Sequence, residues 1–217
     1  EHVKLIDATP IGINVRSTVA TYANVHDELR KLFARTQDAK KLGFKAGDFS
    51  YNTGKLRCPV CDGTGVISLD VQFLPDVKIT CPECRGSRYS KDAQRIRYVN
   101  KKDKEGHARS LPELMAMDVS SALKACQHLK TVSQRLQVLK DLGLGYLTLG
   151  EETPSLSGGE AQRLKLASEM GKAQSDSVFV FDEPTIGLHP LDVRTLIGVF
   201  QTLIDNGATV IVIEHNL

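Results

Sequence analysis

The chain has 217 residues, of which 41% are hydrophobic and 25% are charged, so it can bury a substantial core and is too short for more than two domains. It holds no run of about 18 apolar residues and no leader-like N-terminal pattern, so we expect a cytoplasmic protein without a membrane span. Residues 1–150 carry 24 Lys and Arg against 16 Asp and Glu, whereas residues 151–217 carry 4 against 10; this asymmetry favours a polyanion partner for the first part, or else two solvated surfaces of opposite sign.

The first part of the chain is predicted to be mainly helical, with one β-hairpin. Helices are predicted where apolar residues recur every three or four positions, and hairpin strands where apolar and polar residues alternate. The predicted elements are a helix over 27–39, a loop over 43–56, a hairpin of 66–73 with 77–80, and two helices within 111–142 that stop near Gly143.

The remainder of the chain, after Gly150, is predicted to alternate helices with strands. Its two strands are entirely apolar, which is typical of strands buried on both faces of a parallel sheet. We expect a helix over 160–170, a strand over 178–181, a helix over 192–206 and a strand over 209–213. The alternation predicts a parallel α/β fold.

Four of the five cysteines form two Cys-x-x-Cys pairs, Cys58 with Cys61 and Cys81 with Cys84. Nineteen residues separate the pairs, and this spacing is typical of a four-thiolate zinc site. Such a closed shell leaves no position for water, so we assign the metal a structural role. A redox dithiol is the alternative for either pair, and the lone Cys126 is interpreted as a small buried apolar residue.

Residues suited to phosphate chemistry flank the predicted strands. Asp182 and Glu183 end the first strand, where Asp182 can hold Mg²⁺ and Glu183 can orient or deprotonate a water that attacks a γ-phosphate. Ser157, Gly158 and Gly159 precede a predicted helix, whose free amides favour a phosphate. A capped helix after a turn explains the same three residues equally well.

The order of these motifs resembles that of the ATP-binding-cassette ATPases. Residues 156–162 read LSGGEAQ, residues 181–192 read FDEPTIGLHPLD, and residues 213–215 read IEH. With a Cys-x-x-Cys hairpin ahead of the first motif, the chain is similar to the UvrA family, the damage-sensing ATPases of bacterial nucleotide excision repair. The resemblance covers nearly the whole chain and, through residues 7–12 and 73–76 among others, implies the second, C-terminal cassette.

This resemblance implies an α/β fold: a partial ABC-type ATPase core with a mainly helical signature subdomain and an inserted four-cysteine zinc β-hairpin. The expected segments are a basic, DNA-facing helical segment over 1–57, a zinc hairpin module over 58–89, a helical signature subdomain over 90–149, and an ATPase part over 150–217.

The resemblance also implies cofactors, partners and site residues. The cofactors are structural Zn²⁺, ATP and Mg²⁺, and the partners are damaged double-stranded DNA, a UvrB-type repair protein and a second copy of the full protein. The implied catalytic residues are Glu183 and His215. The implied nucleotide-binding residues are Ser157, Gly158, Gly159, Glu160, Gln162, Asp182, which also holds Mg²⁺, and Asp192. The candidate DNA-binding residues are Arg16, Lys31, Lys40, Lys41, Arg85, Arg88, Arg95 and Arg97.

The sequence departs from the family pattern in two places. It has no G-x-x-x-x-G-K-[ST] phosphate loop, so we expect the isolated chain neither to bind ATP tightly nor to hydrolyse it at a useful rate. Ala8 stands where the family carries a glutamine that senses the γ-phosphate and Mg²⁺, which raises the alternative of a UvrA-like paralogue that protects against DNA-binding drugs. Further alternatives are a zinc-dependent protein-interaction module and a chaperone of the DnaJ type, whose zinc repeats the string Cys-x-x-Cys-x-Gly-x-Gly resembles.

Overall fold

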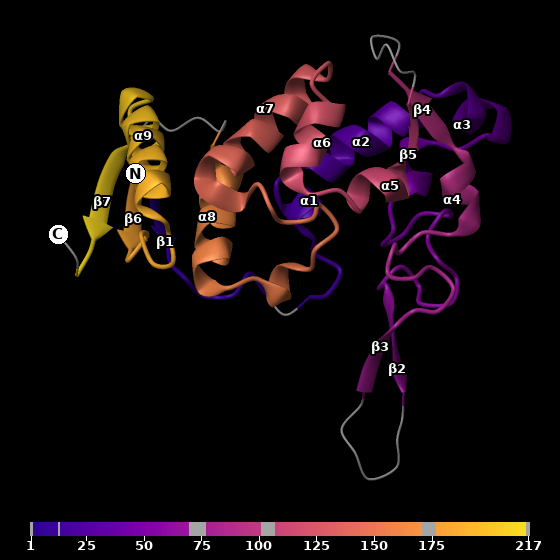
Figure 1. Cartoon of the computed structure of the whole chain (residues 1–217), viewed down its shortest axis with the longest axis horizontal. Helices are drawn as coiled ribbons and strands as arrows, with labels where there is room; N and C mark the ends of the chain where they lie inside the picture. Colours follow the sequence, from indigo (N-terminus) through magenta and orange to yellow (C-terminus); the bar gives the residue numbers. More distant parts are fainter. Residues whose placement is uncertain (1, 13, 70–76, 101–106, 171–176, 216–217) are drawn as a thin grey trace. The chain divides into compact units, whose positions relative to one another are not determined.

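The computed structural model describes residues 2–12, 14–69, 77–100, 107–170 and 177–215, and these form two compact units (Figure 1). The sheet unit comprises residues 1–24 and 118–217, and the cysteine unit comprises residues 25–117. Residues 2–6, which belong to the first segment expected from the sequence, pair with a strand of the last expected segment. None of the helices in the described residues combines the length and the apolar character that a membrane span requires.

The sheet unit is built on three parallel strands in the order β1-β6-β7, with helix α9 beside them (Figure 1). Their bounds are β1 (His2–Ile6), β6 (Ser177–Asp182), β7 (Thr209–Ile213) and α9 (Pro190–Asp205). The predicted parallel α/β arrangement is confirmed, whereas β1 was not predicted. Phe179 and Phe181 of β6 are buried, and the Phe181 ring lies 4.5 Å from that of Phe200 on α9.

The sheet unit contains further helices and helical turns. They are α1 (Val19–Tyr22), α6 (Val119–Ala125), α7 (Lys130–Leu139), a π-helical turn η2 (Lys140–Leu144), a 3₁₀ turn η3 (Thr153–Ser155) and α8 (Gly158–Glu169). The prediction of two helices within 111–142 was wrong: that stretch holds three, because the Asp118 side chain accepts the Ser121 N–H and starts a new helix there. Gly143, at φ +75°, marks the end of this stretch as predicted.

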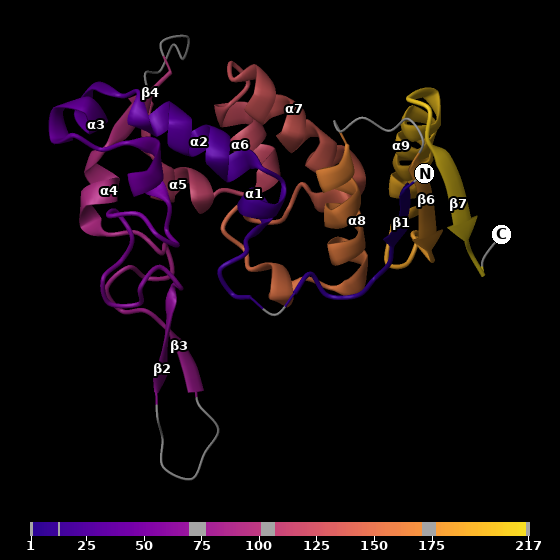
Figure 2. The ribbon, with the colours of Figure 1, turned by 180° about the vertical axis from the view of Figure 1, so that it is seen from behind.

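The cysteine unit combines short helices with two hairpins (Figure 2). Its helices are α2 (Val25–Ala34), α3 (Gln37–Leu42), the 3₁₀ turn η1 (Ala46–Phe49), α4 (Lys91–Arg95) and α5 (Leu111–Met115). Its strands are β2 (Val66–Leu69), β3 (Val77–Thr80), β4 (Arg97–Val99) and β5 (Ala108–Ser110).

Two expectations for this unit have clear outcomes. The hairpin is confirmed, because β2 and β3 pair antiparallel with Val66 opposite Thr80, while the predicted strand residues 70–73 lie outside the described residues. The single helix expected over 27–39 was wrong. It is broken at Thr36, whose side chain accepts the Ala39 N–H and caps α3, so the chain starts a second helix.

Candidate metal centre and nucleotide site

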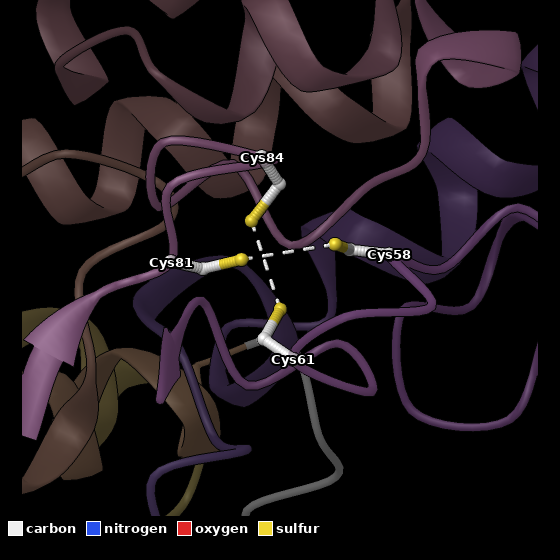
Figure 3. A group of neighbouring side chains, drawn as sticks. All are labelled: Cys58, Cys61, Cys81 and Cys84. Atoms are coloured by element: carbon white, nitrogen blue, oxygen red, sulfur yellow. Dashed lines mark hydrogen bonds between the residues drawn. The ribbon is translucent and has the colours of Figure 1, made fainter. Parts of the chain in front are cut away.

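The four paired cysteines meet at one point in the cysteine unit. Their sulfur atoms all lie within 4.8 Å of one another, and the Sγ–Sγ distances are 3.9 Å for Cys58 with Cys81 and 3.6 Å for Cys61 with Cys84. Figure 3 shows the four side chains pointing toward a common centre, with the two sulfur pairs crossing. Four thiolates at about 2.3 Å from a tetrahedral metal lie about 3.8 Å apart, so this cluster has the size of a zinc site.

Backbone N–H groups surround these sulfurs. The Gly65 N–H donates to the Cys61 sulfur at 3.3 Å, and the backbone of Arg88 and Gly86 donates to that of Cys84. Without a metal, burial raises the pKa of Cys84 to about 12, in spite of these donors. A dication held between the sulfurs supplies the positive charge that four thiolates require.

The turn after the first cysteine pair depends on Gly63. Gly63 adopts φ +79°, and a Cβ atom built on it would lie 1.7 Å from the Tyr51 carbonyl oxygen. Asp62, just before it, also adopts a positive φ of 50°. Only a residue without a side chain fits at Gly63, because both the dihedral angle and the neighbouring carbonyl exclude one.

In the sheet unit, the LSGG segment forms the capped start of helix α8. The Ser157 hydroxyl accepts the Glu160 N–H at 3.3 Å, and the Glu160 carboxylate accepts the Ser157 N–H at 2.8 Å. Glu160 also accepts a hydrogen bond from the Tyr146 hydroxyl; burial and this carboxylate raise the pKa of Tyr146 to about 12. Glu160 therefore serves as part of a helix cap in this structure. Tyr146 is a contact of this turn that the sequence analysis did not predict.

The two glycines of this turn allow close packing. A Cβ on Gly158 would lie 3.0 Å from the Ala8 side chain, and one on Gly159 would lie 3.0 Å from both the Ile186 carbonyl oxygen and the Arg163 guanidinium. The Nε and Nη1 atoms of Arg163 are buried, and neither has a hydrogen-bond partner among the residues that the structure describes. Sequence reasoning missed this arginine, although it follows the LSGGEAQ string directly.

Helix α8 also forms hydrogen bonds to the residues that end two strands. The buried Gln162 amide donates to the carbonyl oxygens of Ile6 at 2.8 Å and Asp182 at 2.7 Å. Lys165, which sequence reasoning missed, donates to the Asp7 carboxylate at 2.7 Å and the Thr9 hydroxyl at 2.9 Å, and the Lys165 bond lowers the pKa of Asp7. The Gln162 amide is therefore engaged by the backbone of β1 and β6.

The ends of β6 and β7 bring three expected residues together. Glu183 follows the exposed Asp182 in a left-handed conformation, at φ +46°, and its N–H donates to the Ile213 carbonyl oxygen at 2.8 Å. The Glu183 carboxylate lies 2.9 Å from Nε2 of His215. Asp192, in the first turn of α9, donates its N–H to the His189 carbonyl oxygen at 2.8 Å. A non-glycine residue at positive φ is strained, and such strain clusters at functional sites.

The candidate DNA-binding residues differ in their exposure to solvent. Arg88 is only 4% exposed, and Arg97 donates to the Ala108 carbonyl oxygen at 2.6 Å and to the Glu113 carboxylate at 2.9 Å. The burial of Arg88 corrects the sequence interpretation for that residue, whereas the Arg97 side chain is 39% exposed and stays a candidate. Arg16 is half-buried, and the exposed candidates are Lys31, Lys40, Lys41, Arg85 and Arg95.

Comparisons with known proteins give a consistent result. No family model matches the chain. It is 44% identical over 213 residues to the UvrABC system protein A of Streptococcus pneumoniae and 46% identical to that of Aquifex aeolicus, in both cases over 98% of this chain and 22% of the relative. The chain thus spans about a fifth of the length of the curated relatives it matches.

A solved structure agrees with these sequence matches. The crystal structure of UvrA2 from Deinococcus radiodurans superposes with a TM-score of 0.87 at 40% identity, over 100% of this chain and 26% of that one. The likeness therefore extends over both the sheet unit and the cysteine unit.

Proposed function

We propose, from the premise that this chain corresponds to a segment of UvrA-family proteins, that it is part of a damage-recognition ATPase of nucleotide excision repair. The observation that carries the proposal is the identity of 44% along 98% of the chain, and the clustered cysteines and the Glu183–His215 pair support it. In this function, ATP binding and hydrolysis regulate how the full protein holds DNA.

The sheet unit supplies one part of the ATPase site. Asp182 holds Mg²⁺, Glu183 positions the attacking water, and His215 contacts the γ-phosphate. Ser157, Gly158 and Gly159 contact a phosphate at the start of α8, where the amides of the two glycines are the available backbone donors. The 2.9 Å contact between Glu183 and His215 supports this assignment, because it links the strand end that binds metal to the end of β7.

The remaining residues of the nucleotide set act less directly. Glu160 caps the helix that carries the phosphate-facing amides, and Gln162 holds the Asp182 carbonyl oxygen in place. Asp192 lies in the first turn of α9 and ends the 187–192 segment, through which two ATP sites communicate.

The cysteine unit holds a structural zinc ion and faces damaged double-stranded DNA. Bound zinc links the two cysteine pairs and thereby fixes the base of the β2–β3 hairpin. Exposed Lys and Arg side chains contact the DNA backbone, which gives sequence-independent, salt-sensitive binding. In the cytoplasm, the full protein works as a homodimer with a UvrB-type partner.

A DNA-binding experiment tests this proposal. The zinc-loaded chain is titrated with a lesion-bearing duplex and an undamaged duplex between about 50 and 200 mM salt. We expect binding that weakens with salt and that is lost in an Arg85→Glu/Arg95→Glu variant, because both side chains are exposed in the cysteine unit.

A matched variant controls for the overall charge. Lys124→Glu/Lys130→Glu makes the same charge change at exposed residues of α6 and α7 in the sheet unit, and we expect it to bind like the unchanged chain. An equal loss of DNA binding in both variants would mean that the change in net charge alone explains it. Binding of protein partners without any DNA affinity would favour the zinc-dependent interaction module, and suppression of aggregation without DNA affinity would favour the chaperone.

A second candidate function is that of a UvrA-like paralogue with a duty such as protection against DNA-binding drugs. Ala8 supports it, because this residue stands where the resemblance implies a glutamine and lies next to Gly158 at the start of α8, where a Cβ on Gly158 would be 3.0 Å from its side chain and its carbonyl oxygen. The isolated chain is expected to be inactive as an ATPase in either case. An Ala8→Gln change in the full protein distinguishes the repair ATPase from the paralogue. In a paralogue adapted to Ala8, we expect no gain in the coupling of ATP to DNA binding, whereas a gain would favour the repair ATPase.

A further inference from the structure

Arg88 touches both cysteine pairs through its backbone. Its N–H donates to the Cys84 sulfur, and its carbonyl oxygen accepts the Cys58 N–H at 2.9 Å. Arg88 adopts φ +70°, a conformation that is uncommon for a residue with a side chain. The backbone is therefore strained at the residue that bonds to one cysteine of each pair.

The Arg88 side chain crosses the turn that follows the first pair. Its Nη1 donates to the Gly63 carbonyl oxygen at 3.3 Å, and its Cγ lies 3.3 Å from where a Cβ on Gly65 would be. Gly65 in turn donates its N–H to the Cys61 sulfur. A side chain from the second turn thus braces the first.

An aromatic cluster fixes the guanidinium. The Arg88 Cζ lies 5.2 Å from the centroid of the Tyr51 ring, and Tyr51 is fully buried. The Tyr51 ring contacts those of His26 at 4.9 Å and Tyr89 at 6.0 Å, which come from α2 and from the residue after Arg88. An arginine held over an aromatic face loses little further freedom when it forms its hydrogen bonds.

The charge of Arg88 complements that of a loaded centre. Four thiolates around a dication carry two net negative charges, and these charges are buried with Cys58, Cys61 and Cys81. Arg88 is itself 4% exposed, so its positive charge is only weakly screened by solvent. Groups that contact metal ligands from outside typically change metal affinity by about 10–100-fold when they are removed.

We propose that Arg88 is a positioning residue of the metal centre, which holds the two Cys-x-x-Cys turns against each other and adds a buried positive charge to the unit that carries the thiolates. This role replaces the DNA contact expected from the sequence. The inference rests on the zinc site of the proposed function.

Zinc affinity measured by competition with a chromophoric chelator tests this role, and Arg85 provides the matched control. Arg85 lies in the same turn at φ +51° but is exposed. We expect Arg88→Met to weaken zinc binding about 10–100-fold and Arg88→Lys to fall between Arg88→Met and the unchanged chain, because lysine keeps the charge without the planar fork. Arg85→Met and Arg85→Lys should bind zinc as the unchanged chain does.

The visible absorption of the Co²⁺-loaded proteins gives a second readout, because it reports the coordination geometry directly. We expect an altered band for Arg88→Met and an unaltered band for Arg85→Met. Equal zinc affinity of Arg88→Met and Arg85→Met would overturn the inference, and an Arg88→Lys variant as tight as the unchanged chain would overturn the bracing role.

Two further results are decisive. If circular dichroism shows that Arg88→Met does not fold, Arg88→Lys is compared with Arg85→Lys instead. Equal zinc affinity of these two variants would then overturn the inference. An unchanged chain that binds no zinc would refute the zinc site itself, which is a failure distinct from that of Arg88.

Discussion

Buried His26 makes the stability of the cysteine unit depend on pH. The Tyr89 hydroxyl donates its one proton to the Phe49 carbonyl oxygen at 2.8 Å, so His26 Nε2, at 2.7 Å, must donate to the Tyr89 oxygen. His26 therefore carries a proton on Nε2, and whether Nδ1 is also protonated depends on the pKa of the ring. Burial, and then the nearby Arg30 charge, lower its pKa from 6.5 to about 3.

The sign and size of the effect follow from proton linkage. Below pH 6.5 the unfolded chain binds a proton at His26 that the folded chain does not, so the folded state loses stability as the pH falls. The contribution is fully present above the unfolded pKa of 6.5 and declines toward pH 3. Between about pH 7.5 and about pH 5.5, this histidine alone lowers the free energy of unfolding by about 1.4 kcal/mol.

Urea unfolding of the zinc-loaded chain, followed by tyrosine fluorescence, measures this loss. His26→Gln removes the titrating group and retains a donor for Tyr89. Between the same two pH values, we therefore expect the free energy of unfolding of this variant to fall by about 1.4 kcal/mol less than that of the unchanged chain. His107→Gln, at an exposed histidine of the same unit, should keep the dependence of the unchanged chain. Identical pH dependence of His26→Gln and the unchanged chain, or an NMR titration of His26 near pH 6.5, would refute this account.

Two further changes test the turns that hold the proposed sites. Gly63→Ala should lower the free energy of unfolding by at least about 3 kcal/mol and weaken zinc binding, because a Cβ there would lie 1.7 Å from the Tyr51 carbonyl oxygen. Gly47→Ala is the control, because a Cβ at Gly47 would meet no atom of the described residues within 4 Å. Equal stability of the two variants in urea would contradict the argument. Ser157→Ala should lower the urea-unfolding free energy by about 1 kcal/mol through loss of the α8 cap, and Ser157→Asp should restore it. Equal stability of Ser157→Ala and the unchanged chain would count against that cap.

Local patterns in the sequence predicted much of the fold. The apolar runs over 178–181 and 209–213 became β6 and β7, because a fully buried parallel strand leaves an unbroken apolar signature. The two Cys-x-x-Cys pairs predicted the cluster, since metal geometry fixes their spacing. Helix breaks were harder to predict, because Thr36 and Asp118 cap new helices within otherwise continuous helical patterns.

The sequence by itself determined which residues carry thiolate and phosphate chemistry, because those residue types and spacings are set by the ligand. Only the tertiary structure decided which charged residues face inward. Arg88 and Arg85 stand in one turn and are the same residue type, yet one is buried against Tyr51 and the other is exposed. Likewise, Gln162 meets the carbonyl oxygens of Ile6 and Asp182 only after distant strands pair. Burial of a polar group depends on partners that are remote in sequence, and no local pattern records them.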